Sequence, residues 1–166
     1  MNKKNVFIDP NVARKKKLGD VLETNKIDAN EPPLFSWIEF NLIGLCNRRC
    51  TFCPWSDPEW RSNHVPKVAG NNDILHLPVE VYTGVMKDLN KVGFKGGIIY
   101  SAFSEPFLYN HLEEVIKISK EQCPDSRIEV VTNGDFLTLE KLNTFFEAGL
   151  TRIDVSVYDG PEKVKP

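Results

Sequence analysis

The fold of this chain is decided by residues 37–54, WIEFNLIGLCNRRCTFCP. Their first part, residues 37–42, alternates apolar and polar side chains and predicts a β-strand. The strand runs directly into a loop that carries Cys46, Cys50 and Cys53. Zinc closes a structural site with four ligands, whereas a cubane iron–sulfur cluster bound by three cysteines keeps one iron open. Three clustered cysteines therefore indicate a reactive cluster.

The composition is that of an ordinary globular domain, with 166 residues of which 41% are hydrophobic and 27% are charged. The formal net charge of −2 gives no overall attraction to nucleic acid or to an anionic membrane. No apolar run approaches the ~18 residues of a membrane span, and residues 1–5 lack the apolar core of a signal peptide. We expect a reducing, cytoplasmic compartment and no nucleic-acid or membrane partner.

The chain has four cysteines, which could form two disulfides. A disulfide framework, however, belongs to short secreted chains whose cysteines are spread along the sequence. Three of these cysteines are clustered, and the fourth, Cys123, follows Ser119 by four positions and Ile116 by seven. That spacing predicts a helical stripe, on which Cys123 serves as a small buried hydrophobic residue.

Two regions differ in composition. Residues 1–34 are polar, contain the basic run Arg14-Lys15-Lys16-Lys17 and end at a Pro-Pro pair, so we expect a partly disordered leader. Acidic residues surround the basic run, which favours a solvated surface over a phosphate site. Residues 35–166 then form the core domain.

In the core, apolar strands alternate with amphipathic helical segments, which predicts parallel strands joined by right-handed crossovers. The third helix is capped by Thr138 and ends at Gly149. The predicted strands are residues 37–42, 96–100, 128–132 and 152–157. The predicted helices begin near Pro78, Leu112 and Thr138, and in the last of them Leu139, Leu142, Phe145 and Phe146 are expected to face inward.

The sheet is expected to have one polar face. Strands 37–42 and 152–157 place apolar residues on one side and polar residues such as Glu39 and Asp154 on the other. A parallel sheet covered on both faces would be apolar on both. We therefore predict an α/β fold with a partial parallel (βα) barrel of about four strands around a polar lumen. Because an open edge is a liability, we expect a truncated barrel.

Unusual side chains follow each predicted strand. The cysteine loop follows the first strand, residues 101–106 follow the second and residues 132–135 follow the third. Ser156 lies near the end of the fourth strand. Since active sites of parallel barrels lie at the carboxyl ends of the strands, we expect these residues to converge.

These motifs, over roughly residues 36–160, resemble in the same order those of the radical S-adenosylmethionine (SAM) superfamily. The resemblance implies that Cys46, Cys50 and Cys53 ligate a [4Fe–4S] cluster whose open iron chelates the amino and carboxylate groups of SAM. An electron from the cluster then splits SAM into a 5′-deoxyadenosyl radical that abstracts hydrogen from a substrate. It also implies the N-terminal part of a (βα)6 barrel, in some members followed by a SPASM-type extension.

The resemblance further assigns contacts to SAM. Glu105 matches the acidic position of the family's glycine-rich motif and is implied to hold the amino group. Asn133 belongs to a Thr-Asn-Gly motif, and Ser156 matches a serine that positions polar groups of SAM. The implied SAM contacts are Phe52, Ser104, Glu105, Asn133 and Ser156.

The sequence departs from the family where Ala102 and Ser104 replace glycines. Small side chains still allow close approach, but Ala and Ser adopt positive φ less readily than Gly. The resemblance also implies a reductant protein such as flavodoxin or ferredoxin. It implies a small-molecule or peptide substrate, which fold analogy cannot identify.

Other interpretations remain open. The cysteines could form a Cys3His zinc site with His64 or His76. Glu105 could be a capping or ion-paired carboxylate, and Asn133-Gly134 is also an ordinary turn dipeptide. The alternative function is a non-catalytic metal-binding module, or a remnant, without SAM turnover.

Overall fold

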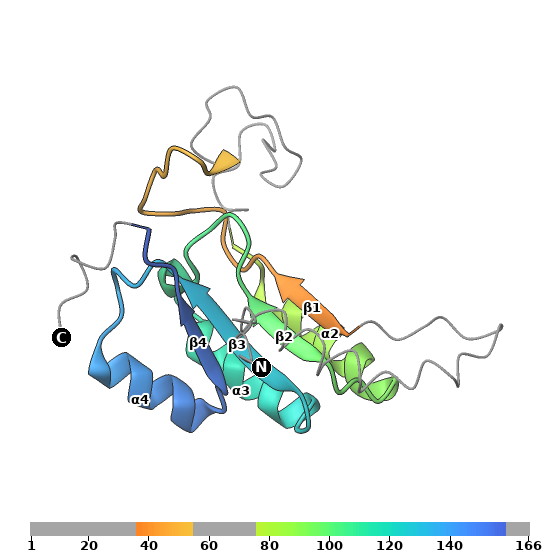
Figure 1. Cartoon of the computed structure of the whole chain (residues 1–166). Helices are drawn as coiled ribbons and strands as arrows, with labels where there is room; N and C mark the ends of the chain where they lie inside the picture. Colours follow the sequence, from red (N-terminus) through yellow and green to blue (C-terminus); the bar gives the residue numbers. More distant parts are fainter. Residues whose placement is uncertain (1–35, 55–75, 159–166) are drawn as a thin grey trace, which may run out of the picture.

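A computed structural model gives the structure of the protein and describes residues 36–54 and 76–158. Four parallel strands form one sheet in the order β1-β2-β3-β4, with helices between them (Figure 1). The strands are β1 Trp37–Phe40, β2 Gly97–Tyr100, β3 Arg127–Thr132 and β4 Arg152–Val155, and the helices are α2 Val79–Lys91, the 3₁₀ helix η4 Pro106–Leu108, α3 Leu112–Gln122 and α4 Leu139–Ala148. The predicted α/β fold with four parallel strands is confirmed. The predicted leader, residues 1–34, lies outside the described residues.

The first strand is shorter than predicted, because its end pairs with a different segment. β1 ends at Phe40, and the carbonyl of Leu42 instead accepts a hydrogen bond from Leu77 N at 2.9 Å. Ile43 forms an isolated antiparallel bridge with His76. The chain thus leaves the sheet before the cysteine loop, and the segment that precedes α2 supports it there.

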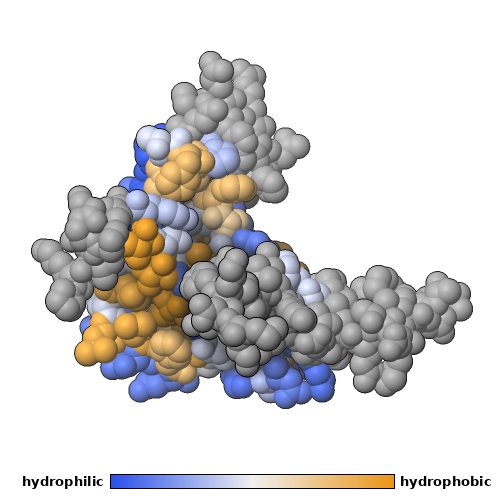
Figure 2. Space-filling model, in the orientation of Figure 1, coloured by the Kyte–Doolittle hydropathy of each residue, from blue (hydrophilic) through white to orange (hydrophobic). Residues whose placement is uncertain are grey.

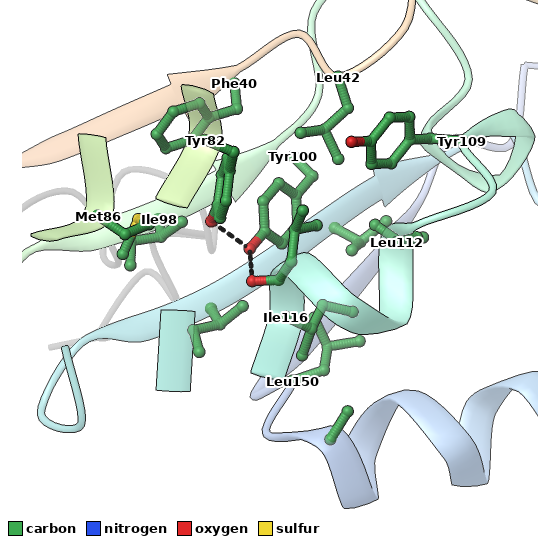
Figure 3. Packing of buried hydrophobic residues seen from close by; sticks show 14 of the residues in the cluster. Phe40, Leu42, Tyr82, Met86, Ile98, Tyr100, Tyr109, Leu112, Ile116 and Leu150 are labelled. Atoms are coloured by element: carbon green, nitrogen blue, oxygen red, sulfur yellow. Dashed lines mark hydrogen bonds between the residues drawn. The ribbon is translucent and has the colours of Figure 1, made fainter. Parts of the chain in front are cut away.

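The hydrophobic core lies between the sheet and its helices (Figure 3). The strands contribute side chains that alternate toward the helices, and α3 packs against both α2 and α4. Burial of each large apolar side chain stabilises the fold by about 1.5–3 kcal/mol. Cys123 is 2% exposed and belongs to this core, as predicted. Central core members are Phe40, Tyr82, Met86, Ile98, Tyr100, Val115, Ile116, Ile128 and Val130.

Three buried hydroxyl groups join α2, β2 and α3 inside this core. Tyr100 Oη lies 2.7 Å from both Tyr82 Oη and Ser119 Oγ, and the hydroxyls of Tyr82 and Ser119 also contact each other. Ser119 Oγ donates to the Val115 carbonyl at 2.8 Å. Burial raises the pKa of Tyr82 to about 12 and that of Tyr100 well above its ordinary value. The hydroxyls therefore stay neutral, and each is hydrogen-bonded, as buried polar groups require.

The opposite face of the sheet is polar, as predicted. The strand register aligns Glu39, Ile99, Glu129 and Arg152 in one row across the four strands. Glu129 is fully buried, and its Oε1 accepts a hydrogen bond from Arg127 Nη2 at 2.6 Å. Ile99 is the apolar member of this row. Pairing of the carboxylate with a guanidinium explains how a charged group is accommodated at this depth.

The caps of α4 agree with the sequence prediction. Thr138 Oγ1 accepts a hydrogen bond from Lys141 N at 3.2 Å, and Gly149 ends the helix with a φ of +115°. The longest described helix, α2, has 13 residues, and no helix among the described residues is long and apolar enough to cross a membrane.

The prediction that Leu139 and Phe146 face inward is wrong, since they are 74% and 47% exposed. Phe145 and Ala148 are the buried residues of α4. Neighbouring helical residues point about 100° apart, so a stripe centred on Phe145 and Ala148 leaves Leu139 and Phe146 outside it. Together with Val155 on β4, they contribute to the apolar surface over α4 and β4 (Figure 2).

Two glycines give a matched test of the helix geometry. A Cβ on Gly149 would lie 2.7 Å from Lys120 Cβ at a φ that disfavours L-residues, whereas a Cβ on Gly84, inside α2, would meet nothing within 4 Å. We expect Gly149→Ala to lower the free energy of unfolding by about 1–3 kcal/mol and Gly84→Ala to raise it by about 0.5–1 kcal/mol. Urea denaturation measures both, and changes of the same sign would contradict the described geometry.

Candidate functional site

The loops that follow the strands meet at the carboxyl end of the sheet. Glu105 N, in the loop after β2, donates to the carbonyl of Leu45 at the start of the cysteine loop, at 2.9 Å. Ser156 N, just after β4, donates to the Thr132 carbonyl at the end of β3, at 2.8 Å. The site residues predicted from the sequence therefore lie on neighbouring segments at the carboxyl end of the sheet.

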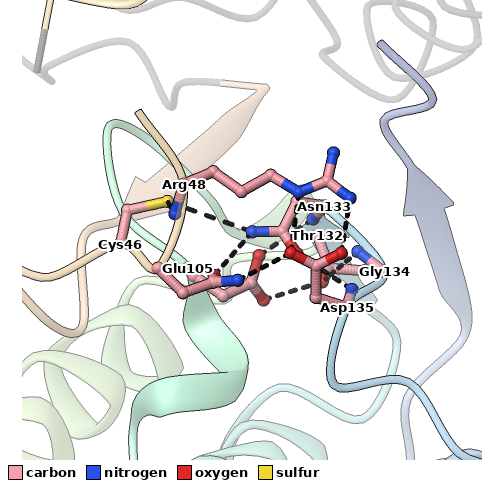
Figure 4. Close-up of polar contacts among 8 residues, drawn as sticks. Cys46, Arg48, Glu105, Thr132, Asn133, Gly134 and Asp135 are labelled. Atoms are coloured by element: carbon pink, nitrogen blue, oxygen red, sulfur yellow. Dashed lines mark hydrogen bonds and ion pairs between the residues drawn. The ribbon is translucent and has the colours of Figure 1, made fainter. Parts of the chain in front are cut away.

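Glu105 joins two of these loops through its side chain (Figure 4). It is only 1% exposed. Its Oε1 accepts hydrogen bonds from Thr132 Oγ1 at 2.7 Å and from Phe107 N at 3.1 Å, and its Oε2 accepts one from Asn133 N at 2.9 Å. The contact with Phe107 N caps η4, so the structure gives Glu105 a capping role. A carboxylate has about four acceptor sites, and three of them are used by these contacts.

The loop after β2 contains a strained residue where the family motif has glycine. Ala102 has a φ of +81° and is the one non-glycine residue with positive φ among residues 36–54 and 76–158. This conformation costs an L-residue roughly 1–2 kcal/mol. Ser104 Oγ donates to Asn41 Oδ1, beyond the end of β1, at 2.6 Å. Ser104 thus links the loop to the segment that follows β1.

Asn133 reaches from the end of β3 to the cysteine loop. Its Nδ2 donates to Asn47 Oδ1 at 2.8 Å and lies 3.9 Å from Cys46 Sγ, which also accepts a hydrogen bond from Arg48 N at 3.4 Å. Burial raises the pKa of the Cys46 thiol, the hydrogen bond from Arg48 opposes the rise and the negative charge of Glu105 adds to it. The two N–H donors oppose this rise, but burial outweighs them, and the pKa of Cys46 stays above its ordinary value.

The three cysteines of the loop are partly buried, and none forms a disulfide. Cys53 N donates to the Cys50 carbonyl at 3.0 Å, which makes a turn of the second half of the loop. Three free thiols on one loop, one of them with N–H donors at its sulfur, form a donor set that suits an iron–sulfur cluster.

The described residues hold no preformed site for a metal ion, and this applies to a cluster as well as to zinc. Within residues 36–54 and 76–158, no three His, Cys, Asp or Glu side chains form a group that could hold a metal ion, and this holds for the cysteines with His76. His64 lies outside the described residues. The loop must adjust before its thiols contact one common group.

The sequence interpretation missed an ion pair beside the cysteines. Arg48 Nε donates to Asp135 Oδ2 at 2.7 Å, and Arg48 Nη2 contacts Asp135 Oδ1. Asn47 Nδ2 donates to the same Oδ2 at 2.6 Å. The hydrogen bond from Arg48 lowers the pKa of Asp135. The sequence signal that could have predicted this pair is the presence of opposite charges in the loops after the first and third strands.

Phe52 lies beside Tyr158, at the surface of the cysteine loop. It is 63% exposed, and its ring packs edge-on against Tyr158 with centroids 4.7 Å apart. These two rings border an open cavity of about 510 Å³. The structure thus brings Cys46, Glu105 and Asn133 together, and Phe52 lines this cavity with Tyr158. The cavity is lined by Arg48, Arg49, Cys50, Thr51, Phe52 and Tyr158.

Removal of the Glu105 carboxylate tests its capping role. Glu105→Ala leaves three donors unpaired in a buried place, so we expect the free energy of unfolding to fall by about 2–4 kcal/mol. Glu113→Ala, in an exposed ion pair with Lys117, is the matched control and should change it by less than about 0.5 kcal/mol. Urea denaturation followed by circular dichroism measures both; equally small losses would show that the Glu105 contacts contribute little.

The strained conformation of Ala102 predicts that a substitution by glycine stabilises the protein. We expect Ala102→Gly to raise the free energy of unfolding by about 0.5–1 kcal/mol, because relief of the positive φ exceeds the added chain entropy. Ala148→Gly, in α4, should instead lower it by about 1 kcal/mol. Thermal unfolding of the two variants provides the comparison, and a loss in both would argue against the strained conformation.

Comparisons with known proteins place these features in context. The model of the radical SAM superfamily matches residues 40–166. The S-adenosyl-L-methionine-dependent 2-deoxy-scyllo-inosamine dehydrogenase of Niallia circulans is 31% identical over 127 residues, which are 76% of this chain and 46% of that protein. The GTP 3′,8-cyclase of Aquifex aeolicus (strain VF5) is 38% identical over 131 residues, 76% of this chain and 36% of that protein.

Solved structures agree with the fold. The crystal structure of BtrN in complex with AdoMet and 2-DOIA matches with a TM-score of 0.65 and 29% identity, over 78% of this chain and 48% of that chain. BtrN in an open conformation matches with the same TM-score and covers 80% of this chain and 55% of that chain. The chain therefore spans between about a third and just over half of the length of these relatives.

Proposed function

Because the chain belongs to the radical SAM superfamily, we propose that it acts, alone or as part of a longer protein, in the reductive cleavage of SAM to start radical chemistry on a substrate. One observation carries the proposal. A loop with three free cysteines follows β1, and it lies against the junction that Glu105 and Asn133 form at the ends of the neighbouring strands.

The three cysteines would hold a [4Fe–4S] cluster. When bound, the cluster supplies the electron that splits the sulfonium of SAM. The chain prepares the loop for this ligand, since Arg48 N and Asn133 Nδ2 direct N–H groups at Cys46 Sγ. Partial burial of Cys46, Cys50 and Cys53 limits the access of water to the sulfurs.

The SAM contacts expected from the sequence form the second part of the proposal. Glu105 keeps one acceptor site beyond its three internal hydrogen bonds, which suits the SAM ammonium group. Because its side chain is 1% exposed, the loops around it must open for SAM to reach this site. Phe52 offers an exposed aromatic ring that suits adenine. Asn133, Ser104 and Ser156 lie on loops at the same edge of the sheet and supply polar groups.

The proposed substrate is a small molecule, and the proposed electron source is a reductant protein such as flavodoxin or ferredoxin. The relatives are named for action on 2-deoxy-scyllo-inosamine and on GTP, both small molecules, which favours this class over a peptide. A cytoplasmic location is proposed because free, clustered cysteines persist in a reducing compartment.

Anaerobic reconstitution with iron and sulfide tests the cluster. We expect about four iron and four sulfide per chain, a broad visible absorption, and formation of 5′-deoxyadenosine when dithionite and SAM are added. Cys50→Ala should lose the cluster, because one of three ligands is gone. Cys123→Ala, a change of the same size in the core, should keep it.

Two outcomes would revise the proposal. Stoichiometric zinc binding without iron would contradict the cluster. A cluster that forms but neither responds to SAM nor cleaves it would support the non-catalytic metal-binding module instead.

A further inference from the structure

We propose that Asp135 is a positioning residue that anchors the cysteine loop, through Arg48 and Asn47, to the end of β3 and so holds Cys46 ready for its ligand. The inference rests on the proposed function where it concerns the cluster. The anchoring of the loop itself is a property of the metal-free chain.

The contact between Arg48 and Asp135 fixes the orientation of the two side chains relative to each other. Two guanidinium nitrogens meet the two carboxylate oxygens, an arrangement that sets direction as well as charge. The side chains are 24% and 34% exposed, so the pair is partly shielded from solvent. It joins positions 87 apart in the chain. An exposed single contact such as Lys95–Asp125, at 3.2 Å with side chains 62% and 65% exposed, lacks these properties.

A second series of hydrogen bonds connects the same carboxylate with Cys46. Asp135 Oδ2 also accepts a hydrogen bond from Asn47 Nδ2, so one carboxylate binds both residues that follow Cys46. Asn47 Oδ1 in turn accepts from Asn133 Nδ2, which lies 3.9 Å from Cys46 Sγ. The backbone N–H of Arg48 reaches the same sulfur. The groups around Cys46 Sγ are thus tied to Asp135.

Asp135 is itself held in place. Its backbone N donates to Asn133 Oδ1 at 2.9 Å, and Gly134 N donates to Thr132 Oγ1 at 3.1 Å. Gly134 has a φ of +82°, and a Cβ there would lie 2.9 Å from Val155 Cγ1. The anchor therefore belongs to a tight turn at the end of β3, which Glu105 secures from the other side.

Such an anchor matters because the loop must present three thiols together. A loop that is free before binding loses conformational freedom when the ligand binds, whereas a loop already held loses less. Arg48 lies between Cys46 and Cys50, so its attachment restrains the segment that joins two of the three thiols.

The metal-free chain provides the first test. The rates at which iodoacetamide alkylates Cys46 and Cys123 are measured by mass spectrometry in wild type, Asp135→Ala, Arg48→Ala, the double variant and the control Asp125→Ala. We expect Asp135→Ala and Arg48→Ala each to speed alkylation of Cys46 about fivefold or more. The double variant should match Asp135→Ala, because Asp135→Ala already removes the contact that Arg48→Ala removes. Asp125→Ala should match wild type, and slow alkylation of buried Cys123 confirms an intact core.

The reconstituted chain provides the second test. Loss of iron to a chelator should be about fivefold faster in Asp135→Ala than in Asp125→Ala. Arg48→Lys keeps the positive charge but loses the two-point contact with the carboxylate. Its rate of iron loss should therefore lie between the rates of wild type and Arg48→Ala.

The outcomes separate the anchor from the proposed function. Wild-type rates of Cys46 alkylation and iron loss in Asp135→Ala, or additive effects in the double variant, overturn the anchor. A wild-type chain that binds no iron but shows the expected alkylation pattern overturns the cluster proposal and leaves the anchor standing. If alanine at position 135 exposes Cys123, Asp135→Asn replaces it under the same criteria.

Discussion

A buried carboxylate organises this structure, because Glu105 accepts three hydrogen bonds from segments that the sheet alone would not hold together. Two of the donors, Thr132 and Asn133, lie at the end of β3, and the third, Phe107 N, belongs to η4, which Glu105 caps. The backbone N of Glu105 also donates to Leu45, where the cysteine loop begins. Loops after three neighbouring strands thus meet at one residue, which helps to fix the relative positions of their side chains.

The position of the cysteine loop follows from that junction. Asn133, fixed through its backbone by Glu105, directs its amide toward Cys46 and Asn47. Two residues later the turn presents Asp135 to Arg48. The strained φ of Ala102 in the same region shows that the loop geometry is kept even where it disfavours the residue present. Packing in the core supplies the rigid sheet from which these loops project.

Much of this arrangement could be predicted from sequence, and the rest depended on three-dimensional contacts. Apolar runs separated by amphipathic segments predicted the four parallel strands. Because parallel strands end on the same side of the sheet, their order in the sequence then predicted that the cysteines, Glu105 and Asn133 would lie close together. The pairing of Arg48 with Asp135 depends on how two loops approach each other, which no local pattern encodes. Leu139 and Phe146 were misplaced because a short helix with many apolar residues does not define which stripe is buried. The SAM contacts stay predictions.

We propose that the three cysteines hold a cluster with one iron open to SAM. Mössbauer spectroscopy of the chain reconstituted with ⁵⁷Fe, before and after addition of SAM, tests it directly. We expect the signal of one iron in four to shift when SAM binds, while the signals of the three cysteine-ligated irons stay nearly unchanged. A spectrum that SAM leaves unaltered, or one that lacks a cubane signal altogether, would contradict it.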